Sequence, residues 1–143
     1  MISRFVLITL LCAAAAPLPA AESNNEVQAR NIALDLAGAF SNDGFKIRDG
    51  HWAGAIKQGD QAVLAVNLYA GNQYWFSVGA EETAKKFTVQ VFDENGKAVP
   101  TENYEDAAKA AAGFSPTISG QYFVSIKPLE GEASSYCLVY SYK

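Results

Sequence analysis

The sequence predicts a mainly β protein, an antiparallel β-sandwich of jelly-roll type with one N-terminal α-helix. Several short segments alternate apolar and polar residues, and turn-forming Gly, Asn and Asp residues separate them. A single segment near the N-terminus instead repeats its apolar residues at helical spacing. With 143 residues, of which 50% are hydrophobic and 12% aromatic, the chain is long enough for one domain with its own core.

Residues 1–21 predict a signal peptide that is removed on export. Arg4 provides the positive charge, the largely apolar stretch 5–16 follows, and residues 17–21 end in the small residues that signal peptidases accept. The apolar stretch is shorter than the roughly 20 residues that a membrane-spanning helix needs. We therefore expect an exported protein, periplasmic or secreted, without a membrane span.

The position of cleavage decides which cysteines remain. Cleavage is expected after Ala20 or Ala21, with Ala16 as the alternative, and each of these removes Cys12. Cys137 then has no partner for an intramolecular disulfide. It is expected to be a small buried residue in a strand, with an intermolecular disulfide as the alternative.

A helix is predicted over residues 25–40, within an N-terminal segment, 22–44, that packs on the sandwich. Ser23 and Glu26 have the spacing of a capping box, and Gly44 can take the positive φ that ends a helix. The apolar face of this helix comprises Ala29, Ile32, Ala33, Leu36, Ala37 and Phe40. Because this face is small and rich in Ala, the helix requires a larger body for its stability.

The remaining residues, 45–143, predict the sandwich domain. Alternation predicts strands over residues 62–69, 73–78, 87–92, 97–100, 121–127 and 135–142. Asn95-Gly96 marks a hairpin turn between the third and fourth of these strands. Gly71 and Gly120 are expected in turns that require positive φ.

Two stretches leave alternatives open. Residues 45–57 are expected to form a short strand or an irregular entry loop. Residues 102–112 are rich in Ala and predict a short helix between strands. Residues 110–114 could instead form a strand edge.

Four segments resemble bacterial pre-peptidase C-terminal (PPC) domains, in the same order. VNLYAGNQYWF (residues 66–76) resembles the family pattern L-x-A-G-x-x-Y-x-F, and FTVQVFDENG (87–96) resembles the strand and turn that follow. FSP (114–116) with SGQYFVSI (119–126) resembles F-x-P…S-G-x-Y-x-V-x-V, and SYCLVY (135–140) resembles the closing strand. The resemblance implies a small, non-catalytic β-sandwich of jelly-roll type with a binding, chaperoning or spacing role outside the cytoplasm.

Few residues are suited to catalysis. His51 is the single histidine, no Gly-x-Ser-x-Gly motif accompanies it, and neither a zinc site nor a nucleotide-binding loop can be assembled. The net charge of −4 argues against a nucleic-acid partner. We therefore predict no enzyme and assign no catalytic residues. A hydrolase based on carboxylates is the remote alternative, and its candidate acids are Glu81, Glu82, Glu102, Glu105 and Asp106.

Calcium is the candidate cofactor, at one turn. Asp93, Glu94 and Asn95 place oxygen donors beside Gly96, but the further ligands of an EF-hand loop are missing. Asp and Asn are also ordinary turn formers, and this explanation is preferred. No metal-binding residue is assigned.

The aromatic residues provide the remaining functional hypothesis. Trp52, Tyr69 and Trp75 are the candidate ligand platform, because exposed rings on one sheet face could stack on sugars. For Trp75 itself, packing beneath the N-terminal helix is the preferred interpretation. The predicted function is an exported, non-catalytic module that binds an envelope protein or a surface polymer. A calcium-stabilised structural module is the main alternative, and the oligomeric state is left open.

Overall fold

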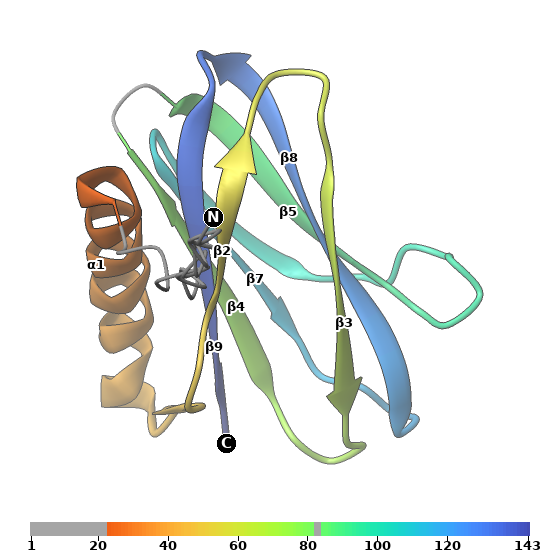
Figure 1. Ribbon diagram of the computed structural model, residues 1–143. Helices are drawn as coiled ribbons and strands as arrows, with labels where there is room; N and C mark the ends of the chain where they lie inside the picture. The colour runs from red at the N-terminus through yellow and green to blue at the C-terminus, as the bar shows by residue number, and fades with distance from the viewer. Residues whose placement is uncertain (1–22, 82–83) are drawn as a thin grey trace, which may run out of the picture.

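The computed structural model describes residues 23–81 and 84–143. Two antiparallel sheets pack face to face, and one helix covers the outer face of the larger sheet (Figure 1). The predicted fold class, a β-sandwich with one N-terminal helix, is confirmed. The jelly-roll connectivity stays a prediction, and the predicted signal peptide lies outside the described residues. No helix in the described ranges is long and apolar enough to cross a membrane.

Within the described residues, the larger sheet has six strands and the smaller sheet has three. The larger sheet has the order β1-β9-β4-β7-β6, and β2 also pairs with β9. Its strands are β1 (Lys46–Ile47), β2 (Trp52–Ile56), β4 (Tyr74–Ala80), β6 (Glu102–Asp106), β7 (Lys109–Phe114) and β9 (Ser134–Tyr142). The smaller sheet has the order β3-β8-β5, formed by β3 (Ala62–Leu68), β8 (Gly120–Gly131) and β5 (Ala84–Phe92).

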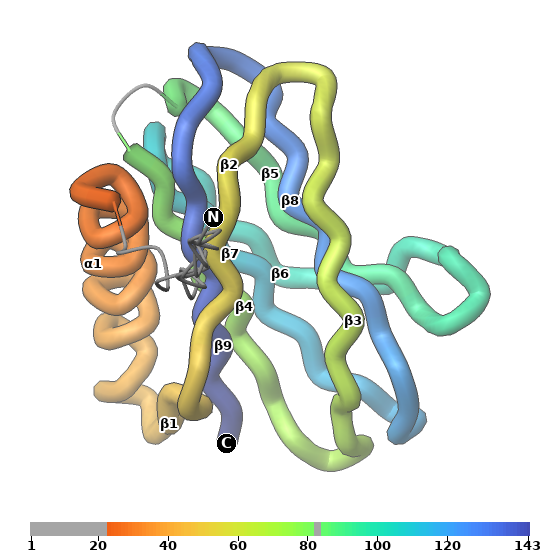
Figure 2. Tube along the Cα trace, in the orientation of Figure 1, coloured from red at the N-terminus to blue at the C-terminus, as the bar shows by residue number. Residues whose placement is uncertain are grey.

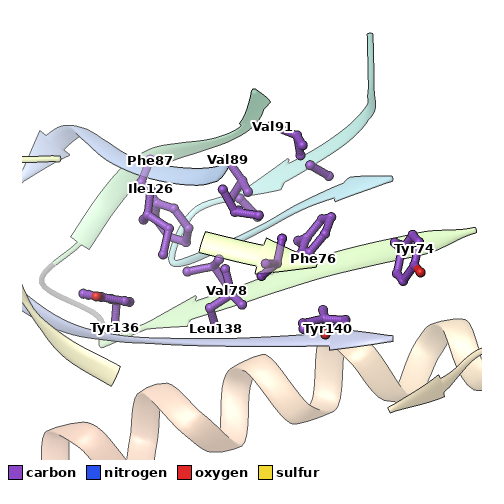
Figure 3. Packing of buried hydrophobic residues seen from close by; sticks show 14 of the residues in the cluster. Tyr74, Phe76, Val78, Phe87, Val89, Val91, Ile126, Tyr136, Leu138 and Tyr140 are labelled. Carbon is purple, nitrogen blue, oxygen red and sulfur yellow. The ribbon is translucent and has the colours of Figure 1, made fainter. Parts of the chain in front are cut away.

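The core lies between the two sheets and consists of the alternate residues that the sequence pattern predicts. Phe76 and Val78 of β4 meet Val124 and Ile126 of β8 there, and none of the four is more than 1% exposed. Figure 3 shows side chains from β4, β5, β8 and β9 pointing into this layer. The alternation therefore fixes which face of each strand is buried.

The helix α1 (Asn24–Phe40) begins with the predicted capping box. The Glu26 N–H donates to Ser23 Oγ, and the Ser23 N–H donates to Glu26 Oε2, both at 3.2 Å. The 3-10 turn η1 (Ser41–Asp43) follows, and Gly44 has a φ of 88°, as predicted. The chain can therefore reverse and enter β1 beside β9.

Small residues form the interface between α1 and the larger sheet. Ala29, Ala33 and Ala37 are fully buried against Cys137 and Val139 of β9. Because the Cys137 side chain is 0% exposed, the structure favours the buried-residue interpretation over an intermolecular disulfide.

The helix backbone approaches the sheet closely at Gly79 of β4. A Cβ atom at this position would overlap the Ala29 carbonyl oxygen and lie 2.5 Å from the Ala33 nitrogen. Both atoms belong to the backbone, which cannot rotate away as a side chain can. The helix therefore lies directly on the strand, and the missing side chain of Gly79 makes room for it.

The helix predicted over residues 102–112 is wrong, whereas the alternative, a strand at residues 110–114, is confirmed by β7. Strands β6 and β7 form a hairpin there, turning at Ala107 with a φ of 51°. Ala110 and Ala112 fill the sandwich core, while Ala111 is 2% exposed on the opposite face. Burial of both faces of β7 outweighs the helix propensity of Ala, because a strand between two layers can be apolar throughout.

Two smaller expectations also fail. The strand predicted over residues 97–100 is reduced to a single bridge between Phe92 and Ala98. Gly120 is not among the residues with positive φ, because it pairs with Leu68 at the start of β8. Gly71 does have positive φ, at 92°.

Replacing Gly79 should test the close approach of the helix. Gly79→Ala is expected to lower the free energy of unfolding by about 2 kcal/mol, because overpacking forces the helix away from β4. Gly38→Ala is the matched control, since a Cβ there meets nothing within 4 Å and should stabilise the helix by up to about 1 kcal/mol. Urea unfolding of both variants measures the difference. Equal stabilities would contradict the packing argument.

Candidate functional site

A hollow of about 260 Å³ lies at one end of the sandwich, and we call it the tyrosine pocket. The turn between β3 and β4, the end of β9 and the residue after β1 come together there, at the lower end in Figure 2. Besides Tyr74, the lining comprises Arg48, Asn67, Tyr69, Asn72, Tyr140 and Tyr142. The lining therefore combines phenol rings, amides and one guanidinium, with no carboxylate.

Tyr74 holds one wall of the tyrosine pocket in place. Its hydroxyl oxygen accepts hydrogen bonds from the Tyr69 backbone N–H at 2.9 Å and from Asn72 Nδ2 at 3.1 Å. The positive φ of Gly71 closes the turn between these two residues. The Tyr69 ring remains 64% exposed. The buried Tyr74 thus fixes the turn, and the turn places the Tyr69 ring at the surface.

Tyr140 forms the inner side of the tyrosine pocket. Its side chain is 6% exposed and its ring contacts Trp52, Tyr74 and Phe76, with the Trp52 ring stacked at 5.8 Å. Figure 3 shows Tyr74 and Tyr140 at the same end of the core layer. Burial raises the pKa of Tyr140, and the nearby Arg48 charge lowers it in part. The phenol therefore stays protonated well above neutral pH.

Arg48 supplies the one positive charge of the tyrosine pocket. Its backbone N–H donates to the Tyr140 carbonyl at 2.9 Å, which continues the pairing of β1 with β9. Its guanidinium carbon lies 5.2 Å from the centroid of the Tyr140 ring. Among the described residues, no carboxylate lies within ion-pair distance of Arg48, and Nη1 reaches only the Asp49 carbonyl, at 3.5 Å. Its charge is therefore available to a ligand.

The structure separates the three residues of the predicted ligand platform. Tyr69 lines the tyrosine pocket, and Trp52 stacks on the inner side of Tyr140. Trp75 lies on the opposite face of the larger sheet and stacks on Phe40, with the ring centroids 4.3 Å apart and an angle of 8° between the ring planes. A Cβ at Gly113 would lie 2.8 Å from the Trp75 ring. Trp75 is thus held between the helix and β7, as the preferred interpretation of this residue describes.

A second groove, of about 570 Å³, runs between α1 and β6. Along the middle of the groove, β7 contributes only the small residues Ala111 and Gly113, and its first residue, Lys109, lines one end. Asp35 of α1 and Glu102 of β6 line opposite walls, and both residues are exposed.

The other candidate groups have structural partners or lie apart from both hollows. Glu81 accepts the Ser135 N–H through Oε1 at 2.9 Å, and His51 is exposed ahead of β2. Asp93 Oδ1 accepts the N–H groups of Asn95 and Lys97, each at 2.9 Å. Asp93 therefore stabilises the turn that leads from the end of β5 to Ala98, which pairs with Phe92. No cluster of three or more His, Cys, Asp or Glu suited to a metal occurs in the described ranges.

Sequence reasoning missed most of the tyrosine pocket. Arg48 follows a strand of two residues, too short to show any periodicity. Tyr140 and Tyr142 lie at alternate positions of the strand predicted over residues 135–142, but no local pattern shows that they meet the turn at Tyr69. The usable signal was the tyrosine alternation at the end of the last strand, beside a turn with two Asn residues.

The fold and the site together define a β-sandwich with a covering helix and a tyrosine-lined hollow at one end. No protein-family model matches the chain, and no curated protein sequence matches it. The PPC resemblance therefore stays a prediction, while the β-sandwich it implies is confirmed. Among solved structures, the chain is similar to Aeromonas hydrophila PliG, a periplasmic lysozyme inhibitor of g-type lysozyme. The identity is 14% and the TM-score 0.48, over 66% of this chain and 85% of the PliG chain.

Replacing Asp93 distinguishes a turn former from a calcium ligand. Asp93→Ala is expected to lower the free energy of unfolding by about 1 kcal/mol, because two N–H groups lose their acceptor. Asp93→Asn retains an acceptor oxygen and should remain within a few tenths of a kcal/mol of the unmodified protein. The melting temperature measured with millimolar CaCl₂ or EDTA should not change. A calcium-dependent rise in melting temperature that Asp93→Asn abolishes would establish a calcium site instead.

The buried tyrosines predict a loss of stability at alkaline pH. Burial raises the pKa of both Tyr136 and Tyr140. Folding therefore favours the protonated phenols, so their contribution is full below about pH 10 and falls as pH rises through the folded-state pKa. In unfolding experiments from pH 8 to pH 11, the Tyr136→Phe/Tyr140→Phe variant should lose less stability than the unmodified protein. Tyr104→Phe, at an exposed strand, is the control, and identical slopes in all three proteins would contradict this assignment.

Proposed function

We propose that this protein is an exported, non-catalytic binding module whose tyrosine pocket holds a sugar ring of a surface polymer. The observation that carries the proposal is the exposed Tyr69 ring beside a hollow of phenols and amides, in a turn that Tyr74 holds through the Tyr69 N–H and the Asn72 amide. The signal-like residues 1–21 support export.

The chemistry of the tyrosine pocket suits a carbohydrate. The C–H groups on one face of a sugar ring form an apolar surface that packs on an exposed phenol ring such as Tyr69. The amides of Asn67 and Asn72 can each donate and accept hydrogen bonds, as sugar hydroxyls require. A small hollow with aromatic walls and a few placed polar groups is the usual form of a small-molecule site.

The same groups argue for binding rather than catalysis. General acid–base catalysis at neutral pH uses side chains that gain and lose protons near pH 7. The tyrosine pocket is lined by amides, phenols and a guanidinium, and burial moves the pKa of Tyr140 upward, away from neutrality. Such groups orient a ligand by hydrogen bonds and packing.

An envelope protein is the second candidate partner, and the groove between α1 and β6 favours it. Strand β6 is exposed along its whole length and forms an edge of the larger sheet. Glu102, Glu105 and Asp106 make this edge acidic, while Phe40 and Trp75 contribute apolar surface to the groove. The two candidate partners would therefore use different surfaces of the protein.

Substitution of Tyr69 tests the carbohydrate proposal. The test uses immobilised bacterial polysaccharides, both neutral and acidic. Tyr69→Ala should raise the Kd at least about tenfold, because the stacking ring is lost. Tyr69→Phe keeps the ring and should bind within about threefold of the unmodified protein. Neither change alters the backbone N–H that Tyr74 holds.

Tyr104→Ala is the matched control, because Tyr104 is also exposed, at 40%, but lies on β6 beside the groove. It should leave polysaccharide binding unchanged. If no polysaccharide binds, or if Tyr104→Ala weakens binding and Tyr69→Ala does not, the proposal is wrong. The second result would favour the groove as the binding surface.

A further inference from the structure

We propose that the tyrosine pocket selects acidic sugars, with Arg48 binding the carboxylate of a hexuronate ring. This inference rests on the proposed function, since it names the ligand class of the same site. It is carried by the position of Arg48, by the absence of carboxylates from the pocket lining, and by the size of the hollow.

Arg48 is held in position while its charge remains uncompensated. The backbone hydrogen bond to the Tyr140 carbonyl fixes the start of the side chain, and the Tyr140 ring supports the guanidinium at 5.2 Å. No carboxylate among the described residues pairs with it. A guanidinium placed in this way can donate two parallel N–H groups to one carboxylate, which a compact ammonium group cannot do.

The surroundings of Arg48 reinforce this preference for an anion. The remaining lining residues are neutral amides and phenols, so no acidic side chain of the pocket competes with a ligand carboxylate. The protein as a whole carries a net charge of −4. Its long-range field therefore does not attract polyanions, and selection of an acidic sugar must come from Arg48 at short range.

The size and shape of the hollow favour a single ring. Its volume of about 260 Å³ lies just below the range of about 300–1,000 Å³ that drug-sized ligands occupy. A sugar ring packed on Tyr69 would place a substituent at C5 within the same small hollow as Arg48. Hexuronates carry their carboxylate at this carbon, whereas neutral hexoses carry a hydroxymethyl group there.

A pair of matched probes tests this inference. Oligogalacturonate and its methyl ester have the same sugar chain, but esterification removes the negative charges. By titration calorimetry, the unmodified protein should bind the acid at least tenfold more tightly than the ester. Arg48→Gln should bind both probes with the weaker affinity, and Arg48→Lys should retain part of the preference. Lys127→Gln, on the exposed outer face of β8, is the charge control and should keep the full preference.

The outcomes separate this inference from the proposed function. Equal binding of acid and ester, weakened by Tyr69→Ala, would overturn the acidic-sugar inference and leave the carbohydrate site intact. Tighter binding of polyglutamate than of oligogalacturonate would also overturn it, because the anion would then be recognised on a peptide. Failure of the unmodified protein to bind either oligosaccharide or any polysaccharide would overturn both proposals. The acid–ester comparison on the unmodified protein stands even if Arg48→Gln does not fold.

Discussion

The direct contact between a helix backbone and a strand backbone is the constraint on which the rest of this structure depends. Gly79 has no side chain, and the Ala29 carbonyl and Ala33 nitrogen occupy the space that a Cβ would need. The same closeness requires small residues on both sides, with Ala on the helix and Cys137 on β9. A helix with a narrow Ala stripe has little apolar area to bury. It therefore gains stability from close fit rather than from large side chains.

The position of the helix determines where the chain reaches the tyrosine pocket. At the end of α1, Phe40 stacks on Trp75 and contacts the edge of Phe45, which is itself buried. Gly44 then reverses the chain, and β1 pairs with β9 in a register that brings Arg48 to the Tyr140 carbonyl. The location of the pocket's guanidinium, that of Arg48, is thus a consequence of how the helix ends, although α1 and the pocket lie on different faces of the larger sheet.

The sequence predicted the helix and the strands better than it predicted which of them come together in the folded protein. Alternation and the capping box are local signals, so the strand faces and the start of α1 follow from neighbouring residues. The Ala-rich segment left helix and strand open, because its helix propensity is a local property, whereas the burial of β7 depends on the sandwich core and on the layer that carries α1. The candidate platform was split for the same reason. Tyr69 and Trp75 are close in sequence, but the first lies in a turn and the second faces the helix. Arg48 left no local signal, because its role arises from pairing with a strand far along the chain.

Two buried hydroxyls show what the close packing costs. Ser77 and Ser141 are 0% exposed, and their Oγ atoms find no hydrogen-bond partner in the described part of the chain. A buried polar group left without a partner costs about 1–3 kcal/mol. Both residues lie on the face of the larger sheet that α1 covers, and their side chains are small, as are those of the Ala residues and Cys137 at the same interface. Small size is therefore favoured over apolar character at this interface. The helix therefore stays in close contact with the sheet, and its position sets the path of the chain to Arg48.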